Sequence, residues 1–138
     1  MARRIPLKLT ILNKVATSTS AGVRVSDFRH CILNIIGSSN ANLKVFVKGA
    51  ISRGAELDTS PTFNVRSSAR DDASAWDFVE VVDLEDGTAI DGDDGINLSG
   101  NVIRNVEINI NSFDWIAIES TAIVAGTCTV VGSFLTNE

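Results

Sequence analysis

Apolar and polar residues alternate with a period of two in three clear stretches of the chain. In residues 5–11 the apolar side chains fall on one face of an extended chain and the polar ones on the other. Residues 43–48 show the same alternation, and in residues 102–110 the apolar face also carries Arg104. This period is the signature of half-buried β-strands, so all three stretches are predicted to be strands.

One further stretch carries apolar side chains on both faces of a strand. In residues 29–36, every position from Cys31 to Ile36 except Asn34 is apolar. A strand in a sandwich turns only one face to the core. The face with Ile32 and Ile36 is therefore expected to be buried against something other than that core.

Further strand candidates and turn signals complete the pattern. Runs rich in Gly, Asn, Asp and Ser separate the candidates, and no stretch shows sustained helical periodicity. The predicted fold class is all-β, an antiparallel β-sandwich or jelly roll of about eight strands with little helix. The other strand candidates are residues 22–26, 62–68, 76–84, 114–121 and 126–135.

The chain of 138 residues is long enough for one domain with a single core, and residues 1–138 are expected to form one. Within it, residues 53–74 are expected to form a long polar loop, and residues 1–5 are a candidate N-terminal arm. The apolar runs are far shorter than the roughly 18 residues of a membrane-spanning helix. Polar residues also interrupt the apolar part of the N-terminus, so we expect no signal peptide and no membrane partner.

The two halves of the chain carry opposite charge. Residues 1–70 hold 11 Lys and Arg against 3 Asp and Glu, a net charge of +8, whereas residues 71–138 hold one Arg against 14 Asp and Glu, a net charge of −13. Such asymmetry is typical of interaction proteins. The overall charge of −5 argues against a protein that binds nucleic acid.

The acidic half contains one candidate metal site. Asp91, Asp93 and Asp94 are close in sequence and are followed by a glycine, which suits the preference of calcium for clustered carboxylates. The twelfth position counted from Asp91 is Val102 rather than the glutamate of an EF-hand loop. Tight turns require Asp-Gly pairs in any case, so we predict a solvated acidic turn with no metal and no cofactor.

The sequence contains no catalytic signature, and no catalytic residue is predicted. His30 precedes Cys31 within a predicted strand, where neighbouring side chains point to opposite faces and do not form a nucleophile–base pair. Nucleophile-elbow, phosphate-loop and dinucleotide-binding motifs are missing. Cys31 and Cys128 lie in apolar alternating runs and are expected to be buried; whether they form a disulfide is left open.

The two tryptophans, Trp76 and Trp115, allow two interpretations. Aromatic faces suit sugar rings, which would favour a glycan-binding module. Each tryptophan nevertheless begins an apolar run after a polar loop, a position typical of packing in a core or interface. Their exposure in the folded protein distinguishes the two.

Four segments, residues 38–52, 76–96, 105–120 and 125–135, together resemble small structural proteins of tailed bacteriophages in their order of strands and turns. The order is similar to that of head-decoration (cement) or virion-accessory proteins. The resemblance implies a β-sandwich, a homotrimer, attachment to a capsid lattice and a location in the virion after synthesis in the host cytoplasm. It implies no catalytic residues.

The predicted function is therefore that of a non-enzymatic virion structural protein, a capsid decoration protein that binds the head lattice as a homotrimer and stabilises it. The expected partners are further copies of the chain and the major capsid protein or another virion protein. Arg3 and Arg4 are the candidate partner-binding residues, and the strand at residues 5–11 could add to a partner's sheet. The alternative is a glycan- or receptor-binding module of the tail-fibre or tail-accessory type; a bacterial surface domain and an enzyme with a carboxylate-lined cleft stay open.

Two kinds of contact are expected in the assembly. Apolar strand faces should form the trimer contact, which salt does not weaken. If the oppositely charged halves separate in space, a basic surface should meet an acidic lattice. That contact should weaken with salt, because exposed charges are screened within about 8–10 Å at physiological ionic strength.

Overall fold

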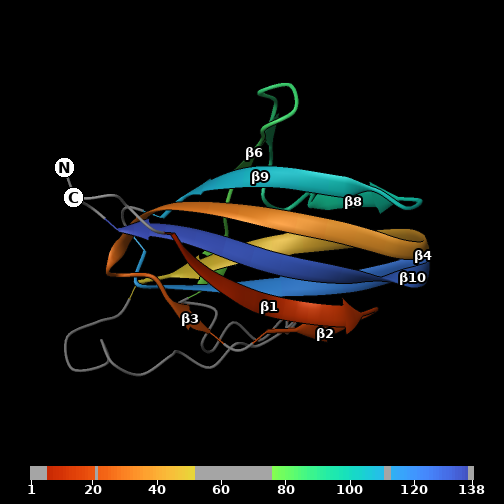
Figure 1. The fold of residues 1–138 in the computed structure, drawn as a ribbon, viewed down its shortest axis with the longest axis horizontal. Helices are drawn as coiled ribbons and strands as arrows, with labels where there is room; N and C mark the ends of the chain where they lie inside the picture. The colour runs from red at the N-terminus through yellow and green to blue at the C-terminus, as the bar shows by residue number, and fades with distance from the viewer. Residues whose placement is uncertain (1–5, 21, 52–75, 111–112, 137–138) are drawn as a thin grey trace.

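The computed structural model describes residues 6–20, 22–51, 76–110 and 113–136. In these residues all regular secondary structure consists of β-strands. All strand pairs are antiparallel and belong to one curled sheet (Figure 1). The prediction of an all-β antiparallel fold is confirmed. The strands are β1 (Leu7–Val15), β2 (Ser18–Thr19), β3 (Val23–Arg24), β4 (Phe28–Ala50), β5 (Trp76–Phe78), β6 (Val81–Asp83), β7 (Ala89–Ile90), β8 (Ile96–Ser99), β9 (Ile103–Asn109) and β10 (Trp115–Thr136).

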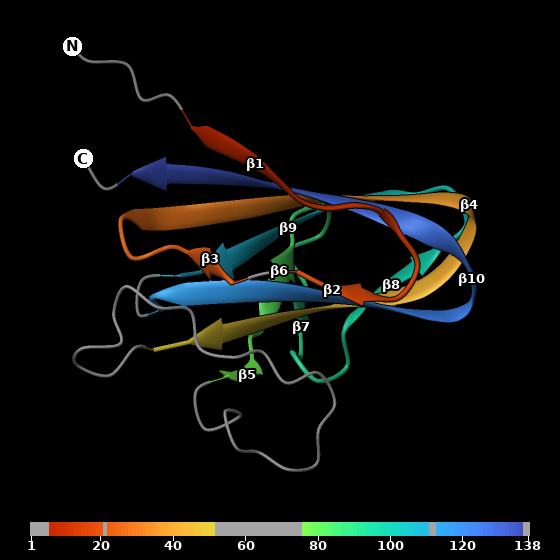
Figure 2. The same cartoon turned by 90° about the horizontal axis from the view of Figure 1, so that it is seen from below.

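β4 and β10 form one long two-stranded ribbon that folds back on itself. Their pairing runs from Phe28 opposite Thr136 to Ala50 opposite Trp115, and both strands turn over at the same end of the molecule (Figure 2). β1, β9, β6 and β7 extend the half of the ribbon with the start of β4. β2, β3, β5 and β8 extend the other half, which lies opposite as the second layer of the sandwich.

The sequence predicts the two halves of each long strand as separate strands joined by turns, and this prediction is wrong. Two opposite register shifts lie at the bend, with extra residues in β10 between Ala122 and Ala125 and extra residues in β4 between Ser38 and Asn42. Such bulges bend a strand while the pairing continues. Gly126 has a φ of 94° there. A Cβ atom at this position would overlap the backbone of Ala41, so the close crossing of the two bent strands requires glycine.

The core lies between the two layers and occupies alternate positions of the strands. The period of two in residues 43–48 and 102–110 predicts its members correctly, because inward-facing residues recur at every second position. The large, fully buried side chains include Leu33, Ile35, Leu43, Val45, Ile96, Leu98, Ile108, Ile116, Ile118 and Phe134.

Cys31 and Cys128 are buried in this core as free thiols, so the question of a disulfide is answered in the negative. Burial raises the pKa of the Cys31 thiol to about 12. Burial also raises the pKa of Cys128, whose Sγ donates a hydrogen bond to the Ser120 Oγ at 3.3 Å. Both thiols are therefore protonated and unreactive at neutral pH, as expected of small apolar core residues.

Three sequence predictions fall outside the described residues. They are the N-terminal arm at residues 1–5 with Arg3 and Arg4, the long loop at residues 53–74 and the short strand at residues 62–68. These stay predictions.

Candidate interaction surfaces

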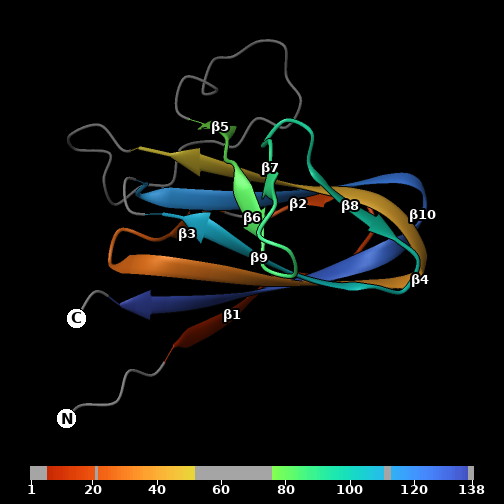
Figure 3. The same cartoon turned by 90° about the horizontal axis from the view of Figure 1, so that it is seen from above.

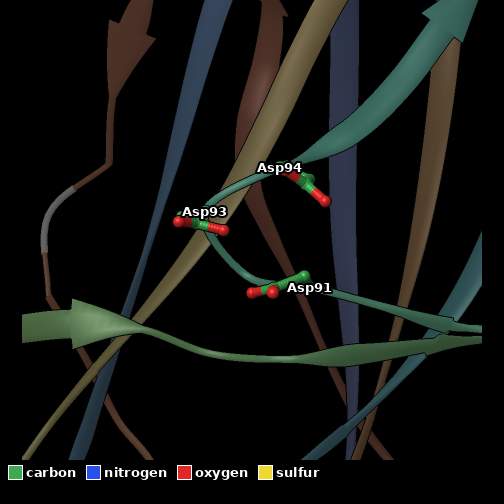
Figure 4. Close-up of side chains that lie close together, drawn as sticks. All are labelled: Asp91, Asp93 and Asp94. Atoms are coloured by element: carbon green, nitrogen blue, oxygen red, sulfur yellow. The ribbon is translucent and has the colours of Figure 1, made fainter.

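The three candidate metal ligands lie together on an exposed turn between β7 and β8. Carboxylate oxygens of Asp91, Asp93 and Asp94 are within 4.8 Å of one another (Figure 4). The backbone amides of Asp94 and Gly95 donate to the Asp91 carbonyl oxygen at 3.1 and 3.3 Å, and the Lys44 Nζ donates to the Asp94 carbonyl oxygen at 3.0 Å. Backbone geometry thus shapes this turn, as the Asp-Gly pattern predicts.

The electrostatics of this turn are unfavourable without a cation. A hydrogen bond with the Asp91 side chain and repulsion from Asp91 and Asp94 raise the pKa of Asp93. All three residues are exposed, and three carboxylates reach the lower end of the six to eight or so oxygens that calcium takes only if every one of them binds through both oxygens. The turn therefore fits a solvated acidic loop better than a built calcium site.

We expect calcium to leave the melting temperature of the chelator-treated protein unchanged to within about one degree. A ligand raises the melting temperature only if it binds the folded state, and the solvated turn is not expected to bind calcium. Thermal unfolding with and without millimolar calcium measures this. The Asp93→Asn variant is the matched control. It removes the repulsion, so it should melt slightly higher than the parent at pH 7. The difference should shrink as the pH falls through the raised folded-state pKa of Asp93 and vanish below the ordinary pKa that the residue has in the unfolded chain. A rise of several degrees with calcium, lost in Asp93→Asn, would mean a real metal site.

Two further acidic residues of this region, Asp83 and Asp86, shape local structure. The Asp86 Oδ1 accepts a hydrogen bond from the backbone amide of Thr88 at 2.9 Å, and this bond lowers the pKa of Asp86. The Asp83 Oδ1 accepts a hydrogen bond from the Glu85 amide at 3.0 Å. Both are side-chain-to-backbone bonds that shape turns, here in the hairpin between β6 and β7.

Arg104 and Asp83 form an ion pair at the margin of the core. The Arg104 Nη2 lies 2.6 Å from the Asp83 Oδ2, and the two side chains are 29% and 7% exposed. Arg104 is the register partner of Ile35, which is fully buried, so it faces inward as the sequence predicts. The sequence gives no sign of its partner, because Asp83 belongs to a different strand of the acidic half.

The two tryptophans are buried in a small second cluster with Ala50 and Ala117. Trp76 is 4% exposed and Trp115 is 8% exposed. A sugar-stacking platform needs an exposed ring face, so their burial favours the packing interpretation.

His30 and Cys31 point to opposite faces of β4, as predicted. Cys31 is fully buried in the core, whereas His30 is exposed. These two side chains therefore do not form a nucleophile–base pair.

The outer face of the layer containing β9 exposes a group of large aliphatic side chains. Ile36 and Ile103 are direct register partners, 38% and 64% exposed, and Ile32 is also 38% exposed. Leu84, 45% exposed, lines the same shallow cavity of about 250 Å³ as Ile103. We call Ile32, Ile36, Leu84 and Ile103 the outer apolar patch. In the single chain Ile32 and Ile36 are exposed rather than buried, because the core covers only the opposite face of β4.

Charged residues are partly separated across the molecule. β1 stands at one end of the sheet order and exposes Lys8 and Lys14, whereas the β6–β7 hairpin at the other end exposes Glu85 and Asp86. β1 runs along the lower edge in Figure 1, and the hairpin faces the viewer in Figure 3. Lys44 belongs to the basic half but contacts the acidic turn, so the separation is incomplete.

Comparison with known proteins shows the fold but no family. No family model matches the sequence, and no curated protein sequence is similar to it. The structure is similar to that of the SPBc2 prophage-derived protein YomS, with a TM-score of 0.68, 12% identity and coverage of 99% of this chain and 97% of YomS. It is equally similar to the PBSX exported protein XepA, with a TM-score of 0.68, 15% identity and coverage of 99% of this chain and 39% of XepA. Both similar structures come from prophages.

Among the described residues there is no helix long and apolar enough to cross a membrane.

Proposed function

We propose that this chain is a non-enzymatic structural protein of a bacteriophage particle, a capsid decoration protein that binds the head lattice as a homotrimer and stabilises it. The observation that carries the proposal is the outer apolar patch on a regular sheet face. The prophage origin of the two similar structures supports the phage context.

The outer apolar patch has the composition of a contact between subunits. Soluble monomers seldom leave large aliphatic side chains exposed next to one another unless the surface binds something. Ile36 and Ile103 are direct register neighbours, and the hydrogen-bonded pair of Asn34 and Asn105 separates them from Ile32. Here the side chains stand on β4 and β9, with Leu84 directly after β6, so paired strands hold them in fixed positions. A rigid apolar face loses little side-chain entropy on association and is well suited to self-assembly.

Other features favour a structural role over the alternatives. Both tryptophans are buried, which disfavours a glycan-binding platform. Both cysteines are buried thiols, and His30 lies on the opposite strand face from Cys31, which disfavours a cysteine–histidine catalytic pair. The shallow cavity beside Ile103 is lined by the carboxylates of Asp83 and Glu85, but the Asp83 carboxylate is already paired with the Arg104 guanidinium, so the cavity does not offer two free acids.

The lattice contact is proposed to use the basic end of the molecule. Arg3 and Arg4 precede β1, which itself exposes Lys8 and Lys14. A capsid surface of opposite charge would attract this end, and salt would weaken the contact.

Gradient-purified particles of the phage that encodes the chain test the proposal. Mass spectrometry should find the chain in a fixed copy number relative to the major capsid protein, in multiples of three per lattice position. Antibody labelling should place it on the head. Absence of the chain from purified particles, with the chain present in the lysate, would overturn the proposal.

A further inference from the structure

β1 has one edge that pairs with no strand in the described part of the chain. It stands at the end of the sheet order, and only its other edge is paired, with β10. From Leu7 to Thr10 the register to β10 is regular, without a bulge. An edge of this kind presents backbone amide and carbonyl groups that can accept another strand.

The leucines of this segment are unusually exposed for an inward-facing position. Leu7 and Leu9 pair with Phe134 and Gly132, and Phe134 is fully buried in the core. They therefore lie on the core side of the sheet, yet Leu7 is 54% exposed and Leu9 is 42% exposed. A strand added beside β1 would bring its own apolar side chains against them, because alternate side chains of paired strands share a face.

The second half of β1 is protected against pairing. Register shifts follow Thr10 and Leu12, and Lys14 has a φ of 51°. Bulges and irregular backbone at an edge discourage the addition of a strand. The regular segment Leu7–Thr10 is therefore the part of the edge that is open to pairing.

Either the β1 strand of a second copy or a strand of a different polypeptide could pair with this edge, and charge distinguishes the two. Residues 1–26 contain five basic residues and no acidic one, and Lys8 and Lys14 are exposed on β1 itself. The β1 strand of a second copy would bring the same charges, and like charges on paired strands are destabilising. An acidic strand from a different polypeptide would be attracted instead.

We propose that the Leu7–Thr10 edge of β1 binds an extended acidic segment of another virion polypeptide by strand addition. The segment carries apolar residues against Leu7 and Leu9 and an acidic residue beside Lys8. Backbone hydrogen bonds supply affinity, and the alternate side chains supply selectivity. The inference rests on the proposed function, since it names the surface and the partner chemistry for attachment to the particle.

A tethered strand tests this inference in the full chain. The sequence Glu-Val-Glu-Val-Glu-Val, joined ahead of residue 1 through a short Gly/Ser linker, can fold back antiparallel to β1 at a millimolar effective concentration or so. Amide exchange followed by NMR should then slow on the order of tenfold at those amides of Leu7–Thr10 that exchange fast in the parent. High salt should reduce this protection.

Two matched controls separate charge from general strand addition. A Lys-Val-Lys-Val-Lys-Val extension should give little protection on the parent chain. In the Lys8→Glu/Lys14→Glu variant the preference should reverse, so that the Lys-Val extension protects and the Glu-Val extension does not. Both substitutions are at exposed positions and should leave the fold intact. Equal protection by the two extensions, or no protection by either, would overturn the inference.

The same proteins separate this inference from the proposed function. The Glu-Val extension should block binding to particles that lack the chain and leave the trimer unchanged in sedimentation. If the parent itself does not bind particles, the proposed function fails, whereas the exchange data report on β1 without any particle. If the extension protects β1 and particle binding persists, β1 is not the lattice contact and the inference fails alone.

Discussion

Replacing Arg104 by methionine is expected to lower the free energy of unfolding by about 2–3 kcal/mol. The Asp83 side chain is 7% exposed and would stay buried without its cation. Breaking a buried pair typically costs about 3–5 kcal/mol, and the 29% exposure of Arg104 lets water compensate in part. Urea unfolding at neutral pH, with its transition midpoint and slope, measures the change.

Two further variants show whether the pair itself is responsible. The Asp83→Leu/Arg104→Met double variant removes both charges and should recover part of the lost stability, because apolar residues often replace a buried pair at little cost, whereas the Glu85 amide loses its hydrogen-bond acceptor. Lys8→Met, at an exposed position, should change stability by no more than about 0.5 kcal/mol. If Arg104→Met alone matched the parent, the ion pair would contribute nothing to the fold.

If the chain forms the proposed trimer, the Ile36→Lys/Ile103→Lys variant is expected to convert it into monomers. These two residues are register partners within the outer apolar patch, and Ile103 is its most exposed member. Burying an unpaired lysine in a subunit contact should cost about 2 kcal/mol or more at each site, which is large against the free energy of a typical small interface. Sedimentation velocity at micromolar concentration measures the change in mass.

A matched surface variant controls for general effects of added charge. Val124 is 75% exposed, lies at the bend of β10 and is not a member of the outer apolar patch. Val124→Lys should therefore leave the proposed trimer intact. A parent that is monomeric at low and high salt would contradict the assembly proposal, and a trimer that survives Ile36→Lys/Ile103→Lys would place the contact elsewhere.

The periodicity of the sequence predicts most strand segments and the inward-facing positions of the core, although it does not predict that the long strands are continuous. The alternation around Val45 and Ile108 identifies the inward face correctly, and it places Arg104 on that face as well. Burial of the two tryptophans also agrees with their position at the start of apolar runs. Such predictions succeed because they depend on local alternation and on the period of the strand alone.

Features that depend on distant residues could not be predicted in the same way. The continuous bend of β4 and β10 arises because two strands bulge together, and the sequence of each bend looks like an ordinary turn. The Asp83–Arg104 ion pair joins two strands, and the two residues are 21 positions apart in the sequence. Leu7 and Leu9 follow the alternation of a half-buried strand, but they are exposed because β1 is an edge strand.

Co-sedimentation of the purified chain with particles that lack it tests the central claim most directly. The proposed function predicts saturable binding to intact heads in multiples of three copies per lattice position, weaker at high salt than at low salt, together with greater resistance of the heads to heat. Binding that does not saturate, binding to tails alone, or no binding at low salt would contradict a capsid decoration protein.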